Sequence, residues 1–198
     1  MKRSPCSVAV LLLALAGGLA GCGSSPIARF YTLKPDATLT SASDAVPLHV
    51  VVNPVTIPDL VDRPQIVTQG AGNQVSLDEF ARWGEPLKGD IARVIAADLG
   101  VLLGSQRVSV FDTGPDFSSA WHVRVDVMRF DSMPGDAVTV DAQWTVWPPK
   151  QSSPVTGHSL EHEPVQGQGY DAVVAAHDRA LAAVSRDIAS AIRTSLAQ

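Results

Sequence analysis

Cysteine is almost absent from this chain of 198 residues, which contains only Cys6 and Cys22. Both lie near the N-terminus, so the rest of the chain has no thiol for a disulfide framework. Basic charge is also in short supply, because 15 lysines and arginines face 20 aspartates and glutamates. An acidic protein has no electrostatic footprint for nucleic acid, and charge alone would not hold it on anionic lipid. Nucleic acid is therefore excluded as a partner.

No apolar run reaches membrane-spanning length. Residues 8–15 form the longest run, which is far shorter than the roughly 20 residues of a transmembrane helix. The run follows Lys2 and Arg3 and leads into small residues, an order typical of a secretory signal. The segment ends in Leu-Ala-Gly-Cys at residues 19–22, which matches the lipobox of bacterial lipoproteins. We therefore expect cleavage before Cys22 and lipid on its thiol; an ordinary secreted protein with an incidental cysteine is the alternative.

These signals divide the chain into three parts. We expect a signal peptide over residues 1–21, a lipidated tether over 22–28 and a single periplasmic domain over 29–198. Stable anchoring takes more than one acyl chain, and a diacylated, N-acylated Cys22 meets that requirement. Gly23 stands where an aspartate often marks retention in the inner membrane, so we expect the outer membrane.

In the remaining chain, the spacing of apolar residues is typical of strands in some segments and of helices in others. Apolar residues recur at every second position over 121–128 and 138–147, with Pro-Gly at 134–135 between them. This alternation predicts two antiparallel strands with one buried and one wet face. Shorter strand patterns occupy residues 29–33, 48–57, 65–69, 74–77, 108–110 and 155–163.

A helical period occurs twice. Residues 86–103 carry one apolar face, with Pro86 suited to an early helical position and Gly104 to the stop. Residues 171–196 carry a second, longer apolar stripe. The order of strands, helix, strands and helix predicts an α+β fold, with a largely antiparallel sheet and two main helices packed on one face.

The sequence offers little for catalysis or metal binding. His158 and His162 are four residues apart, but nearby prolines and glycines favour an extended segment that separates them by about 13 Å. We interpret both as solvated side chains, and His177 as a packing or boundary residue beside the last apolar stripe. A Gly-x-Ser-x-Gly elbow is absent, and residues 70–73 indicate a hairpin turn. We expect no enzyme activity, no cofactor and no metal.

Residues 53–87 are unusual because they combine several prolines, which restrict the backbone, with charged residues and a tryptophan. In one interpretation Trp83 packs against the start of the helix while its charged neighbours are solvated. In the other, the stretch forms a rigid surface for a protein partner, since tryptophan and arginine are frequent at interface hot spots. The residues of this candidate partner surface are Asp62, Arg63, Pro64, Gln65, Arg82, Trp83 and Glu85.

The same region carries a resemblance to a known family. The motifs are Phe-Tyr-Thr-Leu at 30–33, Val-Thr-Ile-Pro at 55–58, Asp-Arg-Pro-Gln-Ile-Val at 62–67 and Arg-Trp-Gly-Glu-Pro-Leu at 82–87. Together with the early Cys22, they resemble the PqiC (YmbA-like) lipoproteins, which are called ABC-type transport auxiliary lipoproteins. The match is specific over residues 22–111 and vaguer over 112–198.

This resemblance implies a non-enzymatic lipoprotein of the outer membrane that faces the periplasm. Its implied partner is a mammalian-cell-entry (MCE) domain protein of the inner membrane, whose oligomer forms a tunnel for lipids. The lipoprotein would dock the far end of that tunnel and support envelope integrity. The resemblance does not decide whether its copies form a homo-oligomeric ring. The alternative is a stand-alone periplasmic carrier that holds an acyl chain under its helices, because core and cavity linings use the same apolar residues.

Overall fold

The computed structural model describes residues 26–41, 45, 48–70, 72–111, 119–149 and 153–197. The expected signal peptide, Cys22 and residues 23–25 of the tether lie outside this part of the chain. In chain order the elements are β1 (Arg29–Tyr31), β2 (Val50–Thr56), β3 (Gln65–Gln69), β4 (Val75–Trp83), α2 (Leu87–Leu103), β5 (Val108–Ser109), β6 (Trp121–Ser132), β7 (Ala137–Trp147), β8 (Val155–Pro164) and α3 (Gly169–Leu196).

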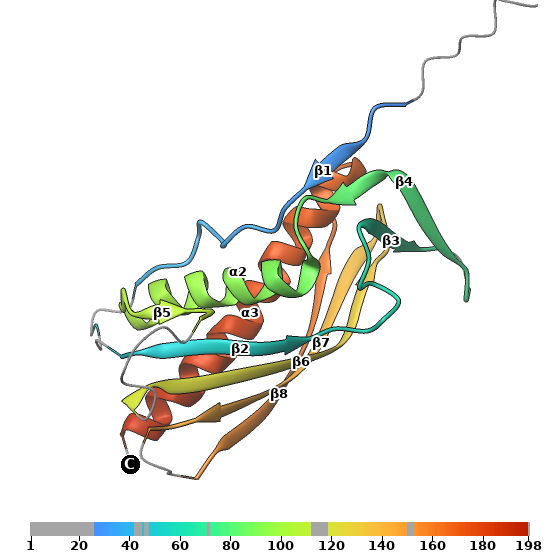
Figure 1. Ribbon diagram of the computed structural model, residues 1–198. Helices are drawn as coiled ribbons and strands as arrows, with labels where there is room; N and C mark the ends of the chain where they lie inside the picture. Colours follow the sequence, from blue (N-terminus) through green and yellow to red (C-terminus); the bar gives the residue numbers. More distant parts are fainter. Residues whose placement is uncertain are drawn as a thin grey trace, which may run out of the picture.

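A five-stranded sheet and the two helices form what we call the body, and they confirm the α+β class (Figure 1). The strand order is β5-β2-β6-β7-β8. Strands β6, β7 and β8 are antiparallel neighbours, as the alternating patterns predict, whereas β2 runs parallel to both β5 and β6. Helix α2 packs on β2 and β5, α3 packs on β7 and β8, and the helices contact each other along one face of the sheet.

The predicted periods explain this packing. Along β6, Trp121, Val123, Val125 and Val127 are buried, and the residues between them are not. They face the apolar stripes of the helices, so the core lies between the sheet and the helix pair. The helical patterns are confirmed to within two residues at each end, and Gly104 ends α2 in the left-handed conformation that glycine favours (φ 63°).

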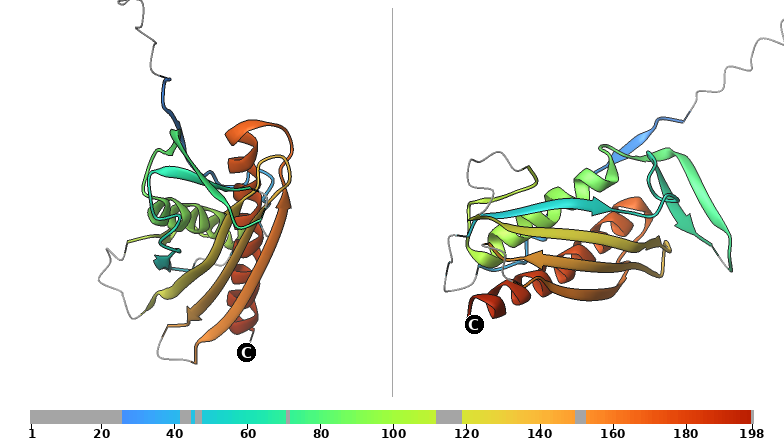
Figure 2. Two further views of the ribbon diagram at one scale, coloured as in Figure 1. Left: turned by 90° about the vertical axis from the view of Figure 1, so that its right-hand side faces the viewer. Right: turned by 60° about the horizontal axis from the view of Figure 1, so that its bottom comes forward.

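The remaining strands form a separate sheet of order β1-β4-β3, which we call the arm. Its β3–β4 hairpin extends away from the body (Figures 1 and 2). Strand β4 continues to Trp83, well beyond the predicted strand at 74–77. The register of β3 and β4 is irregular beyond Leu77, and the carboxylate of Asp78 accepts a hydrogen bond from the Phe80 N–H, so this part of β4 has no simple alternation.

The segment that follows β1 is fastened to the helices by buried or half-buried carboxylates. Three backbone N–H groups of this segment donate hydrogen bonds to carboxylates of the helices. The pairs are Leu33 with Asp90 (2.8 Å), Lys34 with Asp178 (2.9 Å) and Asp36 with Asp98 (3.3 Å). Burial raises the pKa of Asp98 to about 7 and that of Asp178 to about 6. The segment therefore joins the arm to the body at the helix pair.

Candidate functional site

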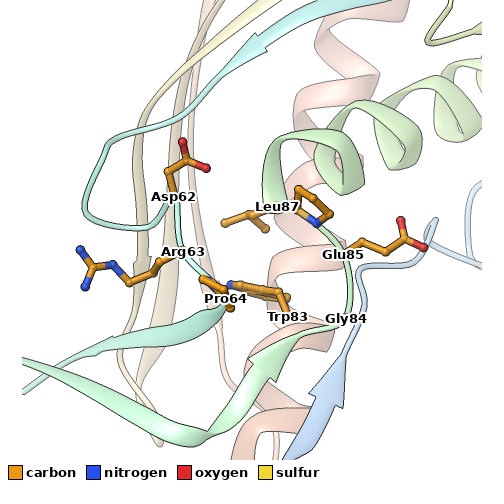
Figure 3. A pocket seen from close by; sticks show the side chains of 8 residues that line it. Asp62, Arg63, Pro64, Trp83, Gly84, Glu85 and Leu87 are labelled. Atoms are coloured by element: carbon orange, nitrogen blue, oxygen red, sulfur yellow. The ribbon is translucent and has the colours of Figure 1, made fainter.

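A hollow of about 380 Å³ lies where the arm meets the body (Figure 3). It opens between the segment that joins β2 to β3 and the segment that joins β4 to α2. The residues lining it are Asp62, Arg63, Pro64, Trp83, Gly84, Glu85, Pro86 and Leu87. Five of the seven residues of the candidate partner surface therefore surround one hollow, although they come from two separate stretches of sequence.

Backbone hydrogen bonds bring these stretches together. The Trp83 N–H donates to the Pro64 carbonyl (2.7 Å), and the Gly84 N–H donates to the Tyr31 carbonyl (2.8 Å). Gly84 suits this crossing because a Cβ there would lie only 3.1 Å from a side-chain carbon of Thr32. Helix α2 starts directly afterwards, and Pro86 immediately before it fits the preference of proline for helix starts.

The floor of the hollow is apolar and continuous with the core. Trp83 is only 6% exposed and Leu87 is buried. The indole packs edge-on against Phe130, with ring centroids 6.3 Å apart and an interplanar angle of 66°. Trp83 thus packs in the core beside the start of the helix, as the first interpretation holds, and also borders the hollow. Replacing it would disturb the fold as well as the site.

Charged side chains surround this floor (Figure 3). Asp62 is paired with Lys88 across 2.5 Å, and Glu85 lies 3.9 Å from Arg93. Arg63 differs, because its Nε is buried and has no hydrogen-bond partner among the described residues. Its guanidinium extends outward, away from Trp83 and Glu85 (Figure 3). The site therefore combines an apolar floor with an arginine that lacks a partner at Nε.

The other two candidate residues lie beside the hollow and do not line it. Gln65 and Arg82 are opposite each other in the β3–β4 pairing. Both bind the carboxylate of Glu79, at 3.1 Å from Gln65 Nε2 and 3.0 Å from Arg82 Nη2. Their side chains are thus engaged within the arm, and their contribution to a partner surface stays a prediction.

Sequence reasoning missed two kinds of polar residue, one beside this site and one along α2. Lys88 directly follows the Arg-Trp-Gly-Glu-Pro-Leu motif and neutralises Asp62, but nothing in the spacing links the two residues. Asp90 and Asp98 are fully buried on α2. Here a signal existed, because Asp98 falls among the apolar positions of the helical stripe, where a carboxylate needs a partner.

The histidines behave as packing or surface groups. His158 and His162 lie on β8, and their rings contact β7 through Asp141 (2.7 Å) and Thr139 (3.1 Å). Their expected extended setting is confirmed. Within the described residues, no three histidine, cysteine or acidic side chains gather closely enough to hold a metal ion.

His177 is entirely buried, which agrees with its interpretation as a packing residue. Its ring stacks on Phe130 at 3.9 Å, and its Nε2 lies 2.8 Å from the Ser132 hydroxyl. Burial lowers the pKa of His177 to about 3, so the ring is neutral at ordinary pH.

Neither α2 nor α3, nor any other helix within the described ranges, has the length and apolar character to cross a bilayer.

Two solved structures share this fold. A crystal structure of an uncharacterized protein superposes with a TM-score of 0.68 at 21% identity, covering 84% of this chain and 99% of that one. A Xanthomonas campestris protein of family DUF330 gives a TM-score of 0.59 at 16% identity, covering 81% of this chain and 92% of its own. No protein with a curated description matches the chain.

The family comparison reaches further than the fold. The model of the ABC-type transport auxiliary lipoprotein component matches residues 31–189. This range includes both segments that line the hollow, both helices almost completely, and every strand from β2 to β8. Because the match spans most of the sequence, the chain belongs to the family of ABC-type transport auxiliary lipoprotein components.

Proposed function

We propose that this protein is the lipid-anchored periplasmic subunit of an MCE-type lipid transport system and helps to maintain the cell envelope. In this proposal it docks an MCE-domain protein anchored in the inner membrane, without performing chemistry itself. Membership of the transport auxiliary lipoprotein family supports the class of function. The observation that carries the docking step is the hollow between the arm and the body, lined by five of the seven candidate partner residues.

The proposed anchor is the lipid on Cys22. Cleavage before this residue removes residues 1–21 and leaves a short tether over 22–28, followed by a periplasmic domain over 29–198. Gly23 favours sorting to the outer membrane. A subunit held there would meet an inner-membrane protein only by reaching across the periplasm, which suits a docking role.

The hollow has the composition of a protein-binding hot spot. Trp83 and Leu87 provide a rigid apolar floor because the core holds them in place. Arg63 provides a half-buried cation beside this floor, and a carboxylate from a partner would pair with the accessible part of its guanidinium. Tryptophan and arginine in such pockets contribute disproportionately to binding.

Charge reversal at Arg63 tests this proposal without disturbing the core. We expect Arg63→Glu to reduce copurification of the MCE-domain protein by tenfold or more, since losing one partner of a buried charged contact costs about 2–5 kcal/mol. Arg107→Glu is the matched control, because Arg107 is exposed near the opposite end of α2. Equal copurification by both folded variants would rule out this hollow as the docking site.

The stand-alone lipid carrier is the competing function. Side chains that are almost fully buried fill the space between the five-stranded sheet and the helices, so a carrier would have to hold lipid in a surface hollow. Native mass spectrometry of the purified lipoprotein separates the two functions. A stoichiometric lipid in addition to the Cys22 acyl groups favours a carrier, and the same spectrum reports whether copies assemble into a ring.

A further inference from the structure

Exposed apolar side chains gather at the end of the arm where the chain enters the structure. Ile27 is 87% exposed, Phe30 on β1 is 67% exposed and Phe80 on β4 is 43% exposed. Strands β1 and β4 pair in parallel from Arg29 opposite Ala81, so Phe80 lies level with the start of β1. These three side chains therefore surround the N-terminal tip of one strand.

A second hollow of about 530 Å³ lies beside this tip. Ile27 and Phe80 line it together with Tyr31 and Tyr170, whose ring centroids are 5.8 Å apart. The charged side chains of Arg29 and Asp78 also line it. Tyrosine combines an apolar ring with a polar hydroxyl and is enriched where membranes meet water. The tip thus presents exposed aliphatic and aromatic groups, with two tyrosines just behind them.

The length of the tether limits how far this tip can lie from a membrane. Ile27 follows Cys22 by five residues, which span at most about 17 Å when fully extended. The polar layer on each side of a bilayer is roughly 5–8 Å thick. A lipid chain on Cys22 therefore keeps Ile27 within about 10 Å of the layer's outer surface. Figure 1 shows that the start of β1 lies on the side of β1 away from the body, so the tip is the part of the described chain closest in sequence to the anchor.

We propose that the tip of the arm, formed by Ile27, Phe30 and Phe80, inserts into the lipid leaflet that holds the Cys22 acyl chains. The tyrosines of the adjoining hollow lie at the boundary between lipid and water. This inference rests on the lipid anchor of the proposed function and adds a fixed orientation to it. Because the chain is acidic, the contact depends on apolar insertion and persists on neutral lipid. The body and the first hollow are then held off the membrane, where a partner can reach them.

Nitroxide accessibility tests this contact in the full acylated protein. The lipoprotein, extracted from bacterial membranes, is reconstituted into phosphatidylcholine vesicles with one added cysteine at a time, Ile27→Cys or Phe80→Cys. Met128→Cys and Leu160→Cys are matched controls, because both are exposed apolar residues on strands of the body. Acylation occupies the Cys22 thiol, so the nitroxide labels only the added cysteine. Circular dichroism checks that each variant is folded.

We expect oxygen, relative to a water-soluble nickel complex, to collide several-fold more often with labels at 27 and 80 than with labels at 128 and 160. Equal nickel access at all four positions would overturn the proposal. Protection that appears only after the MCE-domain protein is added would assign the tip to that partner. Spin–spin broadening between labels at 27 would assign it to a second copy of the chain. Either result overturns the membrane contact.

The same samples separate this inference from the proposed function. If the mass of the N-terminal peptide shows no acyl groups on Cys22, both the anchor and the membrane contact are wrong. If Cys22 is acylated and the labels at the tip are in water, only the membrane contact is wrong. If the labels are in lipid and Arg63→Glu still copurifies the MCE-domain protein, the contact stands and the docking site is wrong.

Discussion

The body and the arm differ in how their strands are covered. In the body, the five-stranded sheet has both helices on one face, and the central strands contribute rows of buried side chains, many of them without any exposure. In the arm, most residues of β4 are exposed, including Val75 and Leu77. Folding free energy is therefore concentrated in the body, whereas the arm has little core of its own.

This difference matches the positions of the two proposed surfaces. A small sheet with exposed apolar residues is a liability unless something covers it. Both proposed surfaces lie in the arm or at its junction with the body: the first hollow around Trp83 and the tip around Ile27. The body holds these surfaces in position, and the arm presents them.

The same substitution in both regions gives the largest expected contrast. Leu99 on α2 has no exposure, so Leu99→Ala should lower the free energy of unfolding by about 2–5 kcal/mol through lost contacts and a residual cavity. Leu77 on β4 is 44% exposed, and Leu77→Ala should change it by about 0.5 kcal/mol or less. Urea denaturation measures both values. Similar losses would show that the arm is as tightly packed as the body.

The body was also the more predictable region from sequence. Regular periods of two and 3.6 gave both helices and the β6–β7 pairing, because each of these elements buries one continuous face. The parallel pairing of β2 with β6 could not be predicted, since it joins residues about 70 positions apart with no periodic sign of it. The separation of the arm as a second sheet was missed for a related reason, because β4 alternates too irregularly after Leu77.

The residue types of the candidate site stood out in the sequence, but their geometry did not. Its prolines, its tryptophan and its charged residues led to a predicted partner surface that includes Asp62, Arg63 and Trp83, and the structure places these three around one hollow. Sequence could not show that Trp83 is buried or that Lys88 neutralises Asp62. These depend on how the β2–β3 segment crosses the start of α2, which is set by the whole fold.

Asp98 offers a second, smaller test at the place where the segment from the arm crosses the body. Burial raises the pKa of Asp98 to about 7, whereas the unfolded chain releases this proton near pH 4. Between about pH 4 and 7 the folded state holds a proton that the unfolded state has lost, so stability falls as the pH rises through this window. Asp98→Asn removes this dependence, because asparagine does not titrate.

The asparagine also fits the hydrogen bonds at this position. Its amide oxygen can accept from the Asp36 N–H, and its NH₂ can donate to Ser185, whose hydroxyl already donates to the Leu181 carbonyl (2.8 Å). We expect urea denaturation at pH 4.5 and 8 to show the variant gaining stability relative to the native chain at the higher pH. Asp178 and His177 titrate in both proteins, so the difference isolates Asp98. Parallel pH profiles would contradict the raised pKa.

Substitution of Gly89, in the first turn of α2, gives the smallest expected change in stability. It also tests whether the stability of the body can change without affecting partner binding. A Cβ built on Gly89 has no atom within 4 Å, and alanine favours helix over glycine by about 0.5–1 kcal/mol. Gly89→Ala should therefore raise the free energy of unfolding by up to about that amount, measured by urea denaturation. Gly89 does not line the hollow around Trp83, so copurification of the MCE-domain protein should stay unchanged. A variant that is more stable but binds less of that partner would show that recognition depends on a flexible start of α2. Such a result would contradict the proposal that a rigid body supports the surfaces and the arm recognises the partner.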